Sequence, residues 1–246
     1  IQAIKAYRPE TNSMSSGQVL HTPYTWAKAR VVVHEMAEAA ALALLDRRLV
    51  TSQLVLYVGY DTESLSDSVI RAGYHGEVQL DHYGRPVPRP AHGNCRLEYP
   101  TSSSRLISQA VLALFDRITD RQLLVRRLNL TSCHVQSEDS ESCLKQKGRP
   151  VQLDLFTDYE QERRDTEVRE KALQRERKLQ QTVLEIKKRF GKNAILMGLN
   201  FDEGATAMER NRQIGGHSAG TTPAMQERAS RKNRDMHNNS DNQTSR

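Results

Sequence analysis

The chain has 246 residues, of which 37% are hydrophobic and only 5% are aromatic. So few apolar side chains cannot build a packed core along the whole length, and we predict one compact domain followed by a long, weakly packed remainder. The formal net charge of +6 favours polyanionic partners. No apolar segment approaches the roughly 20 residues of a transmembrane helix, so nucleic acid is favoured over a membrane. Cys95, Cys133 and Cys143 show no disulfide-framework spacing, and we therefore expect a cytoplasmic protein.

Strand and helix patterns alternate along the first 135 residues. In chain order they predict a strand at 17–21, a helix at 24–48, strands at 53–61, 74–84 and 91–99, a helix at 102–119 and a strand at 122–135. Prolines 86, 88 and 90 indicate a loop or a sheet edge, because proline has no N–H to donate. This order within about 120 residues is typical of an α+β fold: one small antiparallel sheet of about four strands with both helices on one face.

Such a sheet leaves its second face without helices. On the last predicted strand, Leu128 and Leu130 point one way, whereas Arg127, Asn129 and Thr131 point the other. A polar face with arginine suits the phosphate backbone of a nucleic acid, but many antiparallel sheets simply face water on one side. The pattern alone leaves both interpretations open.

A short apolar segment, residues 152–156, interrupts two polar stretches. The preceding residues, 136–150, have the composition of a linker. An extended peptide of this kind can insert Leu155 and Phe156 into an apolar pocket of another protein, with Gln152 as a polar anchor. The alternative is that it folds back on the sheet as an edge strand.

The last third of the chain is strongly polar. Residues 158–191 mix acids and bases and predict a charged helix that ends at Gly191. Its thin apolar stripe consists of Leu179, Val183, Ile186 and Phe190. Residues 192–220 are either a docking segment for a partner or part of a disordered end, and from Thr221 onward too few apolar residues remain to fold.

Two groups of side chains have the chemistry of metal ligands, and both are weak candidates. Asp61 and Glu63 follow a strand, but a two-metal site needs more ligands, and an acidic turn explains them more simply. The second group has spacings that match no standard zinc finger: His92, Cys95, Cys133 and His134. No phosphate-binding glycine loop and no nucleophile triad occurs. We therefore predict no catalytic residue, no metal and no cofactor.

Several blocks occur in one order along residues 1–220, among them "AYRPETNSMSSGQVLH", "VLYVGYD", "LLVRRLNLT", "QLDLF" and "FGKNAILMGLNFDEGATAMERNRQIGGH". Together they resemble the C-terminal part of Y-family lesion-bypass DNA polymerases, in the ImpB/MucB/SamB branch. The resemblance implies that residues 13–135 form the little finger, a four-stranded sheet backed by two helices that lies along the template-primer duplex. It also implies that residues 151–157 hold a peptide that binds the sliding clamp.

The catalytic palm of that family has no counterpart in this sequence. In the family, palm carboxylates hold two magnesium ions. The chain begins with Ile1 rather than Met, so we expect a piece of a longer protein that is inactive alone. Residues 1–12 would then link the little finger to the missing N-terminal catalytic core, and residues 192–246 would form the family tail and a disordered end.

The resemblance and the residue chemistry predict contacts to the sugar-phosphate backbone. Hydroxyls, free backbone N–H groups, a helix N-terminus and arginines can all bind phosphate without reading bases. The predicted DNA contacts are Ser13, Ser15, Ser16, Gly17, Arg96, Thr101, Ser102, Ser103, Ser104, Arg105, Arg126 and Arg127. The predicted clamp contacts are Gln152, Leu153, Asp154, Leu155 and Phe156. The serine and threonine run can equally serve only to cap a helix.

These features predict the DNA-binding and clamp-tethering region of a lesion-bypass DNA polymerase, acting in DNA repair and damage tolerance. The alternative is a free-standing regulatory protein that binds the clamp and never joins a catalytic domain. A sheet-based RNA binder is less favoured, because no strand carries paired aromatic residues for base stacking.

Overall fold

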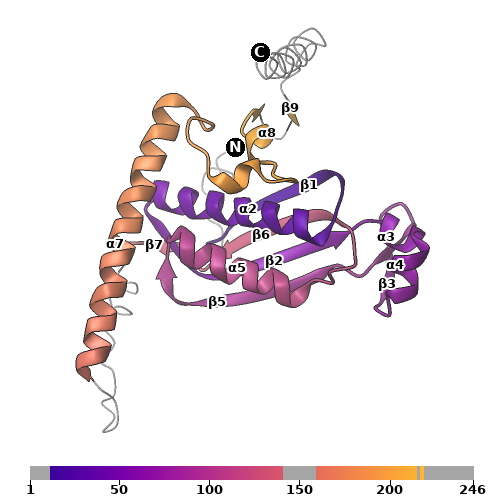
Figure 1. Ribbon diagram of the computed structural model, residues 1–246, viewed down its shortest axis with the longest axis horizontal. Coiled ribbons are helices and arrows are strands. Elements are labelled where there is room, and N and C mark those ends of the chain that lie inside the picture. Colours follow the sequence, from indigo (N-terminus) through magenta and orange to yellow (C-terminus); the bar gives the residue numbers. More distant parts are fainter. Residues whose placement is uncertain (1–11, 141–158, 215–216, 219–246) are drawn as a thin grey trace, which may run out of the picture. The chain divides into compact units, whose positions relative to one another are not determined.

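The computed structural model describes residues 12–140, 159–214 and 217–218. Four long strands form an antiparallel sheet in the order β1–β6–β2–β5 (Figure 1). Their bounds are Met14–Tyr24 for β1, Leu49–Tyr60 for β2, Ala91–Thr101 for β5 and Val125–Cys133 for β6. A short strand, β7 (Gln136–Ser137), pairs with the start of β2. The antiparallel sheet of about four strands is confirmed.

Two helices, α2 (Trp26–Asp46) and α5 (Ser104–Ile118), cover the same face of this sheet (Figure 1). Their apolar stripes meet alternate residues of the central strands, as the sequence patterns predicted. The largest fully buried side chains include Met36, Leu44, Leu54, Leu56, Ile107, Phe115, Leu128 and Leu130. Gly93 of β5 faces α5 where no side chain would fit, because a Cβ there would lie 2.9 Å from Ile118 Cγ2.

The segment between β2 and β5 differs from the sequence prediction. Two short helices, α3 (Glu63–Ser66) and α4 (Ser68–Gly73), precede a separate hairpin of β3 (Val78–Leu80) and β4 (Pro86–Pro88). Only three residues of the predicted strand at 74–84 are therefore extended, and they pair outside the main sheet. All three are exposed, so they offer no apolar face to the core.

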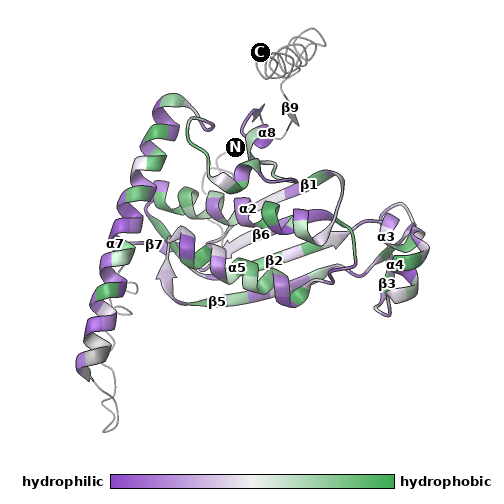
Figure 2. Cartoon of the chain, viewed as in Figure 1, coloured by the Kyte–Doolittle hydropathy of each residue, from purple (hydrophilic) through white to green (hydrophobic). Residues whose placement is uncertain are grey.

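A long helix, α7 (Tyr159–Phe190), confirms the predicted charged helix and ends at Gly191, whose φ is +99°. Figure 2 shows that it is hydrophilic over most of its length. In the predicted apolar stripe Val183 and Ile186 are half-buried, but Leu179 and Phe190 are 65% and 67% exposed. Gln180, which is not part of the stripe, is 7% exposed. The hydrogen bonds between α7 and the domain come from polar side chains: Glu176 and Gln180 bind the start of α5, and Arg177 binds Glu138.

The C-terminal strap, residues 197–206, contains a 3-10 helix at Gly198–Phe201 and docks on α2. Its anchor is Glu35, a buried carboxylate that accepts hydrogen bonds from Asn200 Nδ2 and the Thr206 N–H, both at 2.8 Å. The Thr206 hydroxyl accepts a further bond from Gln18 Nε2. This part of the tail therefore binds the chain's own domain, whereas the sequence predicted either a docking segment for a partner or a disordered end.

Residues from Ala207 onward belong to a second unit. Its described elements are α8 (Ala207–Arg210) and a two-stranded pairing of β8 (Gln213–Ile214) with β9 (His217–Ser218).

Candidate nucleic-acid interface

The sheet face opposite α2 and α5 is here called the open face. The strand registers assign its side chains, which are Ser15, Gly17 and Val19 on β1, Gln53, Val55, Tyr57 and Gly59 on β2, His92, Asn94 and Arg96 on β5, and Arg127, Asn129 and Thr131 on β6. Leu128 and Leu130 of β6 point into the core instead, which confirms the predicted alternation on this strand. The open face carries polar side chains on all four strands, and its apolar members include Val19 and Val55.

Hydrogen bonds between strands fix part of this face. Ser15 Oγ donates to Asn129 Oδ1 at 2.8 Å, and Thr131 Oγ1 donates to Ser15 Oγ at 3.0 Å. Gln53 Oε1 lies 2.9 Å from Nε2 of His134. Hydroxyl and amide groups held in this way resemble the neutral groups that contact DNA phosphates in many complexes.

The three strand arginines of the predicted set differ in their surroundings. Arg96 and Arg127 are exposed on the open face, and no ion pair to either is formed within the described residues. Arg126 is an extra residue in β6 where the register shifts, and its guanidinium donates to the His21 carbonyl at 3.0 Å and lies 3.7 Å from Asp61. Arg96 and Arg127 are therefore the better placed cations for an external anion.

The serine and glycine positions at the start of β1 divide between the two faces. Ser15 and Gly17 lie on the open face, and Ser13 is exposed just before the strand. Ser16 pairs with Leu130 and shares its direction, which is toward the helices. Ser13, Ser15 and Gly17 are therefore accessible to a duplex on the open face, whereas the Ser16 side chain is not.

The serine and threonine run at the start of α5 is covered by α7. Residues 101–104 are all buried, and Ser103 caps α5 by accepting from the Leu106 N–H. The carboxylate of Glu176 accepts from Ser103 Oγ at 2.8 Å and from the Arg105 N–H at 2.9 Å. Gln180 Nε2 donates to Ser104 Oγ at 2.8 Å. The chain's own carboxylate thus occupies the position expected for phosphate, and DNA contact by residues 101–105 stays a prediction that requires α7 to leave.

The two weak metal candidates have other roles in the structure. Asp61 accepts from the Glu63 N–H at 2.9 Å and so organises the turn before α3. His92 lies on the open face, whereas Cys95 faces α5, where its thiol donates to the Ala110 carbonyl at 3.7 Å and burial raises its pKa. Among the described residues, no group of three or more His, Cys, Asp or Glu is placed to hold a metal ion.

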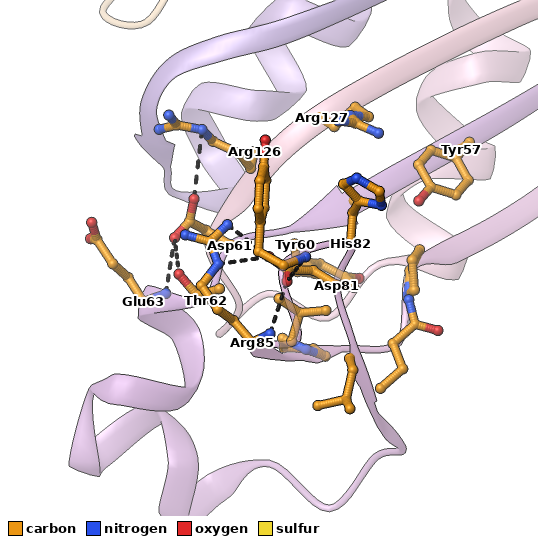
Figure 3. A pocket seen from close by; sticks show the side chains of 17 residues that line it. Tyr57, Tyr60, Asp61, Thr62, Glu63, Asp81, His82, Arg85, Arg126 and Arg127 are labelled. Carbon is orange, nitrogen blue, oxygen red and sulfur yellow. Dashed lines mark hydrogen bonds and ion pairs between the residues drawn. The ribbon is translucent and has the colours of Figure 1, made fainter.

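Sequence reasoning missed the side chains that hairpin β3–β4 contributes beside the open face (Figure 3). Asp81 organises the hairpin loop by accepting from the N–H groups of Tyr83 and Arg85, both at 2.9 Å. The Arg85 side chain also donates to this carboxylate and thereby lowers the pKa of Asp81. The available signal was the Asp81 to Gly84 turn, with two adjacent aromatic rings, His82 and Tyr83, inside it.

A comparison with protein families matches residues 11–144 to the impB/mucB/samB family C-terminal domain. The chain belongs to this family. The match covers more than half of the 246 residues and includes the whole main sheet with α2 and α5. The impB/mucB/samB C-terminal domain is the little finger of Y-family lesion-bypass polymerases, which is a DNA-binding domain.

The family match ends at residue 144, so α7 and the C-terminal strap lie beyond it. The predicted clamp peptide, residues 152–156, also follows the match and lies outside the described residues. A comparison with curated proteins found no match. Within the described residues, every helix is too short or too polar to span a lipid bilayer.

Proposed function

We propose that this chain is the DNA-binding and clamp-tethering C-terminal region of a lesion-bypass DNA polymerase. Its open face holds the template-primer duplex through sugar-phosphate contacts, and residues 152–156 bind the sliding clamp. Residues 1–12 join it to a catalytic core. The predicted linker 136–150 begins with strand β7 and acts as a linker after it, and residues 192–246 form the tail, whose strap at 197–206 docks on α2. One observation carries the DNA half of the proposal: a polar sheet face of a little finger domain presents two exposed arginines that have no ion-pair partner among the described residues.

The spacing of these arginines suits a duplex. Arg96 pairs with Gln53 and Arg127 pairs with Gly59, so their partners are six positions apart along β2. At about 3.3 Å per residue the arginines are roughly 20 Å apart along the strands. Duplex DNA carries one charge per 1.7 Å of its axis, so about a dozen phosphates lie within that length. Two cations at this spacing can hold the duplex along its length through phosphates, without contacts to base edges. A polymerase that must accept any template requires binding of this kind.

The test of duplex binding is a titration of the chain with a fluorescent template-primer duplex at several salt concentrations. We expect the logarithm of the association constant to fall linearly with the logarithm of salt concentration, with a slope of about −0.9 for each phosphate that is neutralised. Two duplexes of unrelated sequence should give the same curve. Absence of binding at low salt, or a strong preference for one sequence, would contradict the proposal.

The clamp half of the proposal depends on the chemistry of residues 152–156. Leu155 and Phe156 supply apolar anchors, and Gln152 supplies a polar one, within a polar stretch of chain. Tethering through such a peptide raises the effective concentration of the polymerase at the primer end. The partner is therefore a ring-shaped clamp with an apolar pocket on its surface.

Purified sliding clamp should retain the chain in a pull-down, and the double variant Leu155→Ala, Phe156→Ala should lose this retention. The double variant removes both apolar side chains that would fill the pocket of the clamp. Leu144→Ala is the matched control, since it shortens an apolar side chain in the preceding linker, outside residues 151–157, and should not change retention. Equal retention of the native chain and the double variant would refute clamp tethering.

A further inference from the structure

A hollow of about 550 Å³ lies at one end of the open face, between the sheet and hairpin β3–β4 (Figure 3). Its residues come from three places: Tyr57, Gly59 and Arg127 from the sheet, the turn at 61–63, and His82 and Tyr83 from the hairpin. Its volume falls within the range of small-molecule sites. Because Tyr57, Gly59 and Arg127 also belong to the open face, the hollow opens beside the surface proposed for the duplex.

We propose that this hollow binds an unpaired nucleobase of a single-stranded segment that adjoins the duplex. This inference rests on the proposed function, because it needs a duplex on the open face to deliver the unpaired strand. It adds a second ligand, a planar base with its phosphate, that backbone contacts to a duplex do not explain.

Flat rings available for stacking are the first argument. Tyr83 is 79% exposed; the Arg85 guanidinium lies over its ring, 5.2 Å from the centroid, and the His82 ring meets it edge-on with the centroids 5.4 Å apart. Tyr57 supplies a third ring on the sheet side of the hollow (Figure 3). Aromatic side chains stack on any base, so they suit a protein that reads no sequence. The hydrogen bonds from Tyr83 and Arg85 to Asp81 hold the hairpin loop in place and so limit the ordering cost of binding.

The floor of the hollow is built around a glycine. A Cβ at Gly59 would lie 3.2 Å from Arg127 Cβ and 3.5 Å from Tyr57 Cε1. The absence of a side chain at Gly59 therefore lets Tyr57 and Arg127 occupy neighbouring positions on the floor. This arrangement places a flat ring beside a cation, which is the combination that a nucleotide requires.

The charges around the hollow indicate one phosphate rather than several. Three arginines line it, but Arg85 is paired with Asp81 at 2.7 Å and Arg126 lies 3.7 Å from Asp61. Arg127 is the lining arginine that forms no ion pair within the described part of the chain. The acidic side chains Asp61, Glu63 and Asp81 also line the hollow and would repel a triphosphate. A neutral base with a single phosphate fits this balance.

The experiment compares three ligands of equal duplex length: a blunt duplex, a duplex with a five-nucleotide overhang, and the same overhang with abasic sites. Overhangs of both polarities are used, and 2-aminopurine replaces single overhang bases in turn. We expect an overhang with bases to bind about tenfold more tightly than its abasic counterpart, which corresponds to about 1.4 kcal/mol. The 2-aminopurine fluorescence should be quenched on binding at one or two overhang positions.

The variant His82→Ala, Tyr83→Ala should lose both the tenfold advantage and the quenching, and it should bind the blunt duplex as the native chain does. Val78→Ala is the control, because Val78 is exposed on the same hairpin and does not line the hollow. Equal affinity for base-containing and abasic overhangs of both polarities, or an advantage that survives in the double variant, would overturn the inference. Failure of the native chain to bind even the blunt duplex would instead overturn the proposed function.

Discussion

Replacement of Arg96 and Arg127 by glutamate is expected to weaken duplex binding by about 100-fold at an ionic strength near 0.1 M. Each substitution removes a cation that can contact phosphate and adds a repulsive charge, and we assign about 1.4 kcal/mol, or a factor of about ten, to each. The log–log salt dependence should also become shallower by about 1.8, since two phosphate contacts are lost. Fluorescence anisotropy at four salt concentrations measures both quantities.

The matched control is Arg169→Glu, Arg175→Glu, which makes the same change in net charge on exposed positions of α7. This variant should bind the duplex within about threefold of the native chain, because charges away from the binding surface act only through a screened, long-range field. An equal loss of affinity in both double variants would mean that overall charge, and not the open face, governs binding. Both variants should unfold at the same temperature as the native chain, since all four side chains are exposed.

The sequence was sufficient for the features that depend on local periodicity. The alternation of Arg127, Asn129 and Thr131 against Leu128 and Leu130 set the direction of each side chain on β6, and the structure confirms it. Helical spacing likewise predicted that α2 and α5 bury one stripe each. Local patterns predict these elements because each buried stripe contacts one continuous core. Every turn of the helix therefore needs an apolar side chain on the same face.

The sequence was insufficient where a polar side chain meets a distant polar partner. Glu176 binds Ser103 and the Arg105 N–H from more than 70 residues away, and Gln180 is buried against Ser102 and Ser104. Neither residue stands out from a charged helix by its pattern. For the same reason the predicted apolar stripe of α7 does not coincide with its buried side: Leu179 is exposed, although Val183 and Ile186 are half-buried. The partner surface, and not the helix alone, decides which side of such a helix is buried.

The substitution Glu35→Ala is expected to release the C-terminal strap while the rest of the domain stays folded. Glu35 is 6% exposed, and its two carboxylate oxygens accept bonds from Asn200 and Thr206, so the substitution leaves these donors without their charged acceptor. A hydrogen bond to a charged group contributes about 1.5–3 kcal/mol. A loss of about 2 kcal/mol should increase amide hydrogen exchange in residues 197–206 by about 30-fold. Mass spectrometry of peptic peptides measures this change.

Glu203→Gln is the matched control for this experiment, because it removes the ion pair of the strap with Lys28 without touching Glu35. Glu203 is 84% exposed in its side chain, and an exposed pair of this kind contributes less than about 1 kcal/mol. Exchange in the strap should therefore rise by less than about fivefold. Amides of α2 and of the central strands should exchange at native rates in both variants. If Glu35→Ala accelerated exchange equally throughout α2 and the sheet, Glu35 would stabilise the domain as a whole, and the strap would not be a separately docked segment.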